Sequence, residues 1–489
     1  MKKLLCVSIV AIIFPFVLRA QNVGIGTDSP LAKLHVADSS VLFSANGDIE
    51  DLHASTPNIP FLPGKRLFFW YPPKGAVRIG YGEAANYSTI GAYSFAQGYQ
   101  NTASGIYSVA QGAFSEARGD NSFAMGVGAI ANDEGAVAFG NNCTAGSYAF
   151  VMGSASQASA PMSFAMGSSA VASGTNSFSF GDNTNASGEK SFTAGSENTA
   201  SGSGSIALGS VNASTGNCSF ASGFTSNALA GYASSLGFFT TASGKASFAG
   251  GDSSTASGYA SVSMGYLTEA SGNFSSAFGS SVSTNHHKGS IILGDADPNN
   301  KGIMLQAADN QFAARFNGGY YLVTGNSGAI NTGVVLNAGD NSWSAISDST
   351  KKEKRLPVNG EQILKGIAGI KISTWNYKGQ NPVSFRHYGP MAQDFYHAFG
   401  HDAYGSIGND TLINQQDYLG VSFAAIQALE KRTERLEEIQ RENKTLQQEN
   451  TKLSSQLQRL SETVALLQQQ INSLALKEKD KKKKEVASR

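Results

Sequence analysis

The chain has 489 residues, of which 55 are glycine and only 15% are charged, and its 36 Lys and Arg balance its 36 Asp and Glu. This length exceeds one compact domain, and the balanced charge argues against a nucleic-acid partner.

The first 20 residues, MKKLLCVSIVAIIFPFVLRA, predict a signal peptide. Two lysines precede an apolar run of about 15 residues, and Ala20 is a suitable cleavage point, so the mature chain would begin at Gln21. Cys6 lies inside the apolar run, which favours simple cleavage over a lipid anchor. No other run approaches the roughly 18 apolar residues of a membrane-spanning helix. We therefore expect an exported protein, extracellular or at the cell surface, with no transmembrane span.

Residues 21–85 contain strand-like stretches with Pro and Gly turns, and we expect them to cap the end of the region that follows. Within them, Phe69, Trp70 and Tyr71 are either packing residues or a carbohydrate platform, and packing is favoured.

A repeat occupies residues 86–294. Its closing glycine recurs every 14 residues, except for a step of 13 into Gly153 and one of 15 into Gly294. Such a period indicates a solenoid of stacked coils, since one coil buries too little surface to fold alone. The aligned glycines are Gly98, Gly112, Gly126, Gly140, Gly153, Gly167, Gly181, Gly195, Gly209, Gly223, Gly237, Gly251, Gly265, Gly279 and Gly294.

The positions three and one before the repeated glycine are mostly large and apolar, as Phe123 and Met125 are before Gly126, and they alternate with Ser and Ala. This alternation predicts a strand with one bulky face. We expect Phe and Met to form the core, Ser and Ala the thin outer face, and glycine the turn. A second turn, ASG, recurs between the strands, for example at 103–105 and 200–202.

The motifs NSFAMG, GSIALG and ASG at this period resemble the head repeats of trimeric autotransporter (YadA-like) adhesins. The resemblance implies a left-handed parallel β-roll, three identical chains side by side, and a surface-exposed binding rod. The outer surface carries few charges, so weak repeated contacts with a glycan or a host or matrix protein are expected, and an inert spacer is the alternative. Cys143 and Cys218 lie too many coils apart to form a disulfide and are expected to be unpaired.

Residues 295–345 contain further strands, which we expect to form a β connector. His286 and His287 precede them as a pair, which we interpret as a polar turn rather than a metal site.

The composition changes near residue 347, where Ser347 and Lys352 stand five positions apart in a polar segment. A lysine beside a serine can act as its base when its amine is uncharged. Read alone, this signal is weak, and a solvated turn followed by the amphipathic helix of GEQILKGI is the favoured interpretation.

The ordered motifs SD with Lys352, ILKGI, TWNYKG and HYGPMAQDF resemble the chaperone of endosialidase family over about residues 344–435. The resemblance implies a trimerising intramolecular chaperone that cuts the chain between Ile346 and Ser347. Ser347 would be the nucleophile, Lys352 the general base and His387 a helper. Many members have Arg and Leu where this chain has Thr350 and Lys351, which bears on the efficiency of cleavage.

Apolar residues follow a heptad pattern from 429 to 476, which predicts a coiled coil. Asn443 and Asn450 at core positions favour dimers in simple coils, whereas both resemblances favour a trimer. Residues 477–489 are expected to form a frayed, solvated basic tail or, alternatively, to contact an anionic lipid or glycan.

Neither a metal nor a cofactor is expected. His387, His397 and His401 do not make a convincing metal site because Gly400 interrupts the helix that would align the last two. The predicted architecture is mainly β: a signal peptide (1–20), a β cap (21–85), a β-roll (86–294), a connector (295–345), a small α+β chaperone domain (346–428), a coiled coil (429–476) and a tail (477–489).

The leading functional hypothesis is a homotrimeric adhesin-like fibre that its C-terminal chaperone assembles and then releases. The alternative is a self-processing serine peptidase whose main purpose is to release the N-terminal part.

Overall fold

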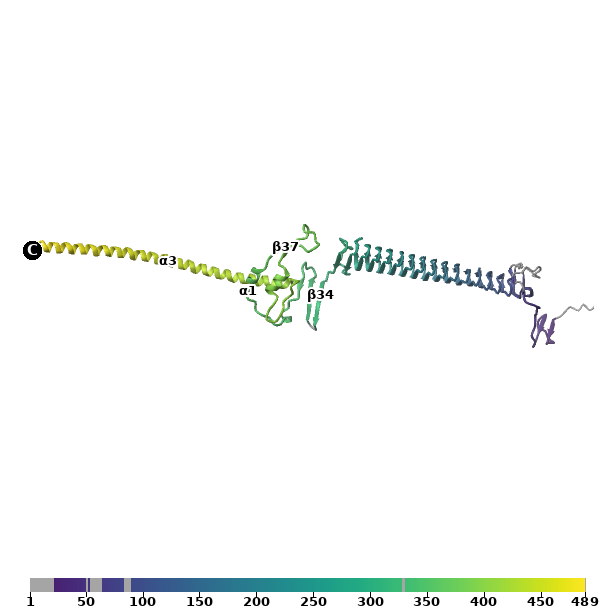
Figure 1. Ribbon diagram of the computed structural model, residues 1–489. Helices are drawn as coiled ribbons and strands as arrows, with labels where there is room; N and C mark the ends of the chain where they lie inside the picture. The colour runs from purple at the N-terminus through teal and green to yellow at the C-terminus, as the bar shows by residue number, and fades with distance from the viewer. Residues whose placement is uncertain (1–21, 50–51, 53–63, 83–88, 328–329, 489) are drawn as a thin grey trace, which may run out of the picture. The chain divides into compact units, whose positions relative to one another are not determined.

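The computed structural model describes residues 22–49, 52, 64–82, 89–327 and 330–488 (Figure 1). They belong to two compact units, Met1–Asn317 and Gly318–Arg489. The predicted signal peptide lies outside the described residues.

Most of the first unit is a solenoid, and the described strands of this solenoid form one 31-stranded sheet. Each regular coil contributes a five-residue strand and a two-residue strand, and each pairs in parallel with its counterpart one coil further on, as Gly126 does with Gly140. The predicted parallel β-roll is therefore confirmed, and its stacked coils are visible in Figure 1.

The longer strands are β5 (Phe95–Tyr99), β7 (Val109–Ala113), β9 (Phe123–Val127), β11 (Val137–Asn141), β13 (Phe150–Ser154), β15 (Phe164–Ser168), β17 (Phe178–Asp182), β19 (Phe192–Ser196), β21 (Ile206–Ser210), β23 (Phe220–Phe224), β25 (Ser234–Phe238) and β27 (Phe248–Asp252). The short strands are β6 (Thr102–Ala103), β8 (Glu116–Ala117), β10 (Ile130–Ala131), β12 (Thr144–Ala145), β14 (Gln157–Ala158), β16 (Val171–Ala172), β18 (Asn185–Ala186), β20 (Thr199–Ala200), β22 (Ala213–Ser214), β24 (Asn227–Ala228), β26 (Thr241–Ala242) and β28 (Thr255–Ala256).

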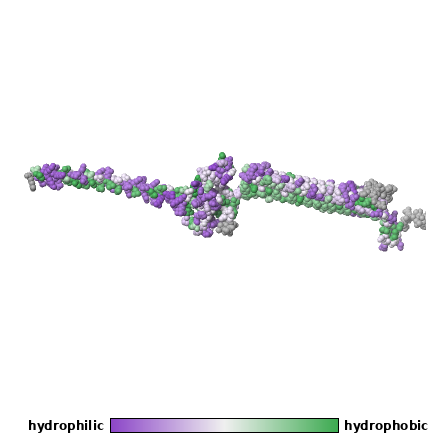
Figure 2. All heavy atoms as spheres, in the orientation of Figure 1, coloured by the Kyte–Doolittle hydropathy of each residue, from purple (hydrophilic) through white to green (hydrophobic). Residues whose placement is uncertain are grey.

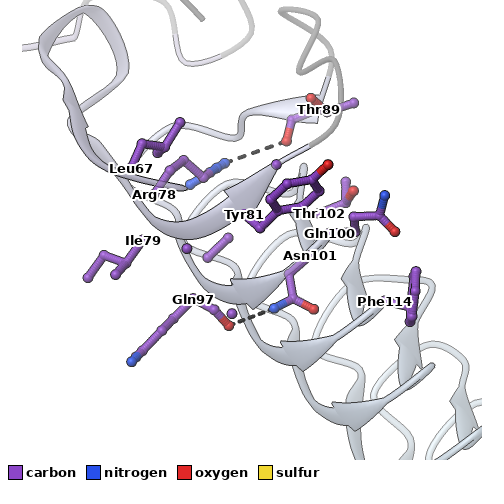
Figure 3. Close-up of a pocket in the computed structure, with 14 residues that line it drawn as sticks. Leu67, Arg78, Ile79, Tyr81, Thr89, Gln97, Gln100, Asn101, Thr102 and Phe114 are labelled. Carbon is purple, nitrogen blue, oxygen red and sulfur yellow. Dashed lines mark hydrogen bonds between the residues drawn. The ribbon is translucent and has the colours of Figure 1, made fainter. Parts of the chain in front are cut away.

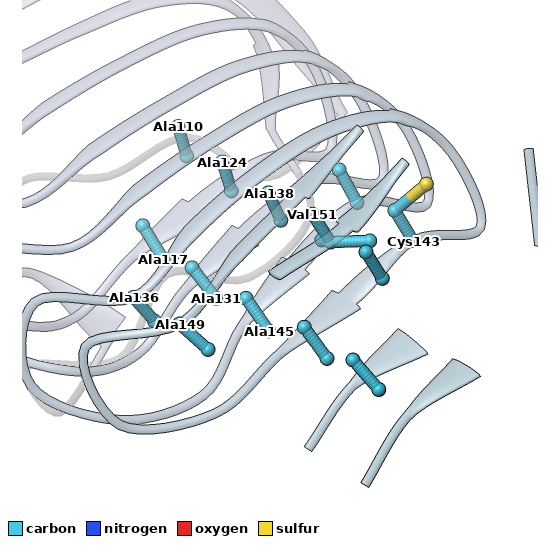
Figure 4. Packing of buried hydrophobic residues seen from close by; sticks show 14 of the residues in the cluster. Ala110, Ala117, Ala124, Ala131, Ala136, Ala138, Cys143, Ala145, Ala149 and Val151 are labelled. Atoms are coloured by element: carbon cyan, nitrogen blue, oxygen red, sulfur yellow. The ribbon is translucent and has the colours of Figure 1, made fainter. Parts of the chain in front are cut away.

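The interior of the roll is made of small side chains. In the coil around Gly126, four residues point inward and are at most 2% exposed: Ser122, Ala124, Ala129 and Ala131. Figure 4 shows the resulting rows, in which Ala110, Ala124 and Ala138 follow one another from coil to coil.

The prediction that Phe and Met form the core was wrong. Phe123 and Met125 lie on the outer face of β9 and are partly exposed, whereas Ala124 between them is buried. A coil of 14 residues encloses too narrow a space for aromatic rings, so the small residues face inward. The bulky residues form an apolar outer face, visible as a hydrophobic band along the roll in Figure 2. Neighbouring rings on this face stack, as Phe150 and Phe164 do with centroids 4.7 Å apart.

The repeated glycine is required by a close approach between coils. Gly126 has φ +142°, and a Cβ there would lie 1.9 Å from the carbonyl oxygen of Gly140. The carbonyl oxygen of such a glycine accepts a hydrogen bond from an interior polar side chain of the preceding coil. Ser115 Oγ donates to Gly126 O at 3.1 Å, and Asn198 Nδ2 donates to Gly209 O at 2.7 Å.

Non-repetitive strands close the roll at each end. At the N-terminal end, β3 (Lys65–Tyr71), η1 (Pro72–Lys74) and β4 (Ala76–Gly82) form a hairpin, and β4 pairs in parallel with β5. Tyr71 is buried with Ala76 and Ile90, which fits the packing interpretation of this aromatic stretch. The preceding segment holds a separate parallel pair, β1 (Val23–Ile25) and β2 (Leu34–Val36).

At the C-terminal end the ladder continues through β29 (Val262–Ala270), β30 (Ser276–Ser283), β31 (Ile291–Gly294), β32 (Met304–Leu305) and β33 (Phe312–Arg315). Cys143 is buried and Cys218 is exposed, and neither forms a disulfide, as predicted.

The second unit begins with the antiparallel strands β34 (Gly319–Ser327), β35 (Ile330–Asn337) and β36 (Ser344–Ala345). A 3-10 turn η3 (Ser349–Lys351), helix α1 (Gly360–Gly369), the strands β37 (Ser373–Trp375) and β38 (His387–Gly389), and helices α2 (Ala392–Phe399) and α3 (Gln415–Val486) follow.

Helix α3 is 72 residues long. Its first part packs on α1, where Ala425 and Ala428 are buried, whereas seam residues further along are exposed in the single chain, with Leu446 at 55%. The basic segment after residue 476, expected to fray, is helical as far as Val486. Among the helices that the structure describes, none is both long and apolar enough to span a membrane.

Candidate functional site

Ser347 and Lys352 lie together just after the last strand of the β34–β36 sheet. Strand β36 ends at Ala345, and the turn η3 reverses the chain between the two residues. Lys352 Nζ donates a hydrogen bond to Ser347 Oγ at 2.6 Å, and both side chains are exposed in the single chain. The structure therefore brings together the two residues that the motif singled out.

Asp348 holds the turn that makes this contact possible. It is the N-cap of η3, and its carboxylate accepts a hydrogen bond from the backbone N–H of Thr350 at 2.9 Å. This hydrogen bond lowers the pKa of Asp348, so the carboxylate stays ionised and the cap persists at neutral pH. The SD motif contains Asp348, but its sequence pattern alone does not indicate this capping role.

The bond before Ser347 is anchored on the sheet. Ala345 pairs with Val334 in β35, and Ile346 N donates to Gly333 O at 3.5 Å. The Ile346 carbonyl is therefore attached to an ordered strand on one side and to the Ser347 turn on the other. An ammonium that donates to Oγ orients the hydroxyl, and a neutral amine in the same place could accept its proton. The arrangement can support an intramolecular attack of Ser347 on the Ile346 carbonyl.

His387 belongs to a different cluster. It faces Trp375 across the β37–β38 pair, with ring centroids 4.6 Å apart, and its ring also meets Tyr377 edge-on at 5.6 Å. The contacts recorded for the described residues do not join His387 to Ser347 or Lys352. Its proposed role as a helper has no direct geometric support in the single chain.

An ion pair joins α1 to α3 and was not predicted. Arg432 forms two hydrogen bonds with the carboxylate of Glu361, through Nε at 3.0 Å and through Nη2. The guanidinium lowers the pKa of Glu361. The two residues are 71 positions apart, so no local sequence signal could have linked them.

The histidines considered for a metal do not converge. His287 Nδ1 lies 3.1 Å from Asp309 Oδ1, and His401 packs edge-on against Tyr396. Within the described ranges, there is no group of three His, Cys, Asp or Glu residues placed to hold a metal ion.

Two protein-family models match the chain, one in the roll and one in the second unit. The structure combines a parallel β-roll that has an apolar outer face with a second unit that contains a Ser–Lys pair and a long helix. The model of the YadA head domain repeat matches residues 90–115, 117–142, 158–184, 172–192, 186–211 and 256–281. The chaperone of endosialidase model matches residues 347–402, beginning at Ser347. The chain thus carries adhesin-type head repeats and then an intramolecular-chaperone domain, and no curated protein matches it.

Proposed function

We propose that the chain is an exported homotrimeric fibre of the adhesin type, extracellular or on the cell surface, which its domain at 346–428 assembles and then releases by a cut between Ile346 and Ser347. The remaining proposed segments are a signal peptide (1–20), a cap (21–85), a roll (86–294), a connector (295–345), a coiled coil (429–476) and a tail (477–489).

The observation that carries the proposal is the apolar outer face of the roll. Its large side chains cannot enter the interior, so in one chain they stay in contact with water, as Phe178 (43% exposed) does. Covering one such half-exposed side chain would contribute roughly 1 kcal/mol, and the face repeats over the whole roll. Identical chains side by side would cover it, because each coil presents the same face at the same height.

Helix α3 also favours an assembly of identical, parallel chains, although its seam does not by itself set their number. Its heptad seam residues are exposed, among them Leu453 (58%) and Leu460 (61%). This seam needs partner helices to cover it, just as the outer face of the roll needs neighbouring rolls. Three chains also face a register problem, because neighbouring coils are nearly identical. A C-terminal unit that trimerises first would give all chains a common starting height.

Light scattering on the purified full-length chain tests the trimer. The Ser347→Ala variant, which should stay uncut, is measured beside it. A trimer mass of three times its single-chain mass is expected for this variant, and a monomer at micromolar concentration would overturn the proposal. Release is tested separately by intact mass spectrometry, which should find fragments that end at Ile346 and begin at Ser347. Ser347→Ala should abolish them, whereas Ser349→Ala, two residues away, should not.

A second candidate is a self-processing serine peptidase whose purpose is timed release. The contact between Lys352 Nζ and Ser347 Oγ favours it. This candidate requires that cleavage be needed for function, whereas the fibre does not. A Ser347→Ala trimer that retains surface attachment and ligand binding would reject the peptidase as the main function.

A further inference from the structure

The N-terminal end of the roll contains a polar cavity of about 280 Å³ (Figure 3). It lies where β4 meets the first regular coil. Residues of its wall that carry the argument are Arg78, Tyr81, Gln100, Thr102 and Phe114.

Arg78 is a buried cation, and none of the described residues is recorded as placing a carboxylate beside it. Its register partner in β5 is the inward-facing Ala96, so its side chain enters the interior, and it is only 8% exposed. Burial lowers its pKa to about 10. The recorded acceptors are Val77 O and Ser94 O for Nη1, and Ser94 Oγ, Ala103 O and Thr89 O for Nη2.

Among the described residues, these contacts leave the positive charge of Arg78 without a counter-charge. All five acceptors are neutral, and for the described residues no hydrogen bond of Nε–H is recorded. A buried charge is costly unless a counter-charge is near. An anion that entered the cavity would provide one and would find the Nε–H as a donor.

The rest of the wall suits a sugar ring. Tyr81 stacks on Tyr99 at 5.0 Å, so one face of its ring is covered, and Phe114 is half exposed. Gln100 and Thr102 are partly buried, and no side-chain hydrogen bond is recorded for either within the described part of the chain. Aromatic surface, an amide and a hydroxyl are groups that contact the carbons and hydroxyls of a carbohydrate.

We propose that this cavity binds a carboxylate-bearing sugar unit, of the uronic-acid class, with its carboxylate toward Arg78 and its hydroxyls toward Gln100 and Thr102. The inference names a ligand class for the adhesin-like fibre and so rests on the proposed function. A neutral sugar of the same shape lacks the charge that Arg78 selects.

The full-length chain, titrated calorimetrically with glucuronate and with glucose, tests this directly. Saturable binding of glucuronate is expected, with glucose at least about tenfold weaker. Thr102→Val should weaken glucuronate binding about tenfold, because it removes one hydroxyl at constant shape. Thr144→Val is the matched control: Thr144 occupies the same ladder position, is equally buried and lies outside the cavity, so binding should not change.

Arg78→Gln should abolish binding, and the threonine pair keeps the test valid if that variant does not fold. The proposal is overturned if wild-type chain binds neither sugar, if glucose binds as well as glucuronate, or if Thr102→Val and Thr144→Val behave alike. If the wild type binds neither sugar while Arg78→Gln lowers the melting temperature, Arg78 only closes the end of the roll. Light scattering on the same samples separates a failed ligand proposal from a failed trimer.

Discussion

Asn212, in the interior of the roll, donates a hydrogen bond from Nδ2 to the carbonyl oxygen of Gly223 in the next coil, at 2.8 Å. The same amide donates to Leu208 O at 2.7 Å, and its Oδ1 accepts from Ser226 N at 2.7 Å. One side chain therefore satisfies polar backbone groups of two coils in a place that water does not reach.

Asn212→Ala should lower the free energy of unfolding by about 2–4 kcal/mol, because it leaves several buried backbone groups without partners. Urea unfolding followed by circular dichroism measures the loss. Asn132→Ala, which removes an asparagine from the outer side of the roll, is the control. Similar losses in both variants would show that the interior ladder is not a main source of stability.

Gly126→Ala should be far more damaging than an ordinary glycine substitution. The new Cβ would lie 1.9 Å from Gly140 O, and the backbone at φ +142° disfavours a side chain. Gly231→Ala is the control, since its nearest recorded neighbour to an added Cβ is Asn217 O at 3.7 Å. We expect loss of soluble, folded protein for the first variant and a melting temperature within a few degrees of wild type for the second. Equal tolerance would contradict the close packing of coils.

The comparison of Phe123 with Ala124 shows what could be predicted from the sequence and what could not. The period of 14 fixes the register of the coils, so the roll followed from spacing alone. An alternation of large and small residues is compatible with either face of the strand pointing inward. The hydrophobicity of the large residues favoured placing them inside, which is wrong. The width of the closed coil decides which face points inward, and this width is a property of the three-dimensional structure. The contact of Ser347 with Lys352 could be expected from a local motif, whereas the Glu361–Arg432 pair depends on the packing of distant helices.

Phe164→Asp should dissociate the proposed trimer. Phe164 lies on the apolar outer face, stacked against Phe150 and Phe180, and in a trimer its aspartate would be buried without a counter-charge. Val171→Asp places the same charge on the opposite, short-strand side and should leave the assembly intact. Sedimentation velocity distinguishes the two. Persistence of trimers in Phe164→Asp would show that this face is not the interface.

Lys352→Arg should abolish the cut before Ser347 without changing the charge. Arginine can still donate a hydrogen bond to the hydroxyl but remains charged and cannot accept its proton. Lys351→Arg, one residue earlier, should cleave like the wild type. The two fragments are counted by intact mass spectrometry over a time course. Normal cleavage by Lys352→Arg would remove Lys352 from the role of base and leave it only a positioning role.

The Glu361–Arg432 pair should make the second unit sensitive to acid. Arg432 lowers the folded-state pKa of Glu361. The pair therefore stabilises the folded state at pH values above 4.5, the ordinary pKa of Glu, and this stabilisation is lost as the pH falls through the lowered pKa. Glu361→Gln should therefore melt below wild type at pH 7, and the gap between the two should narrow as the pH falls below 4.5. Glu438→Gln, a glutamate of α3 for which no ion pair is recorded, is the control and should follow the wild type at both pH values. A gap between Glu361→Gln and wild type that stays constant from pH 7 to pH 3 would show that the carboxylate acts through packing and not through its charge.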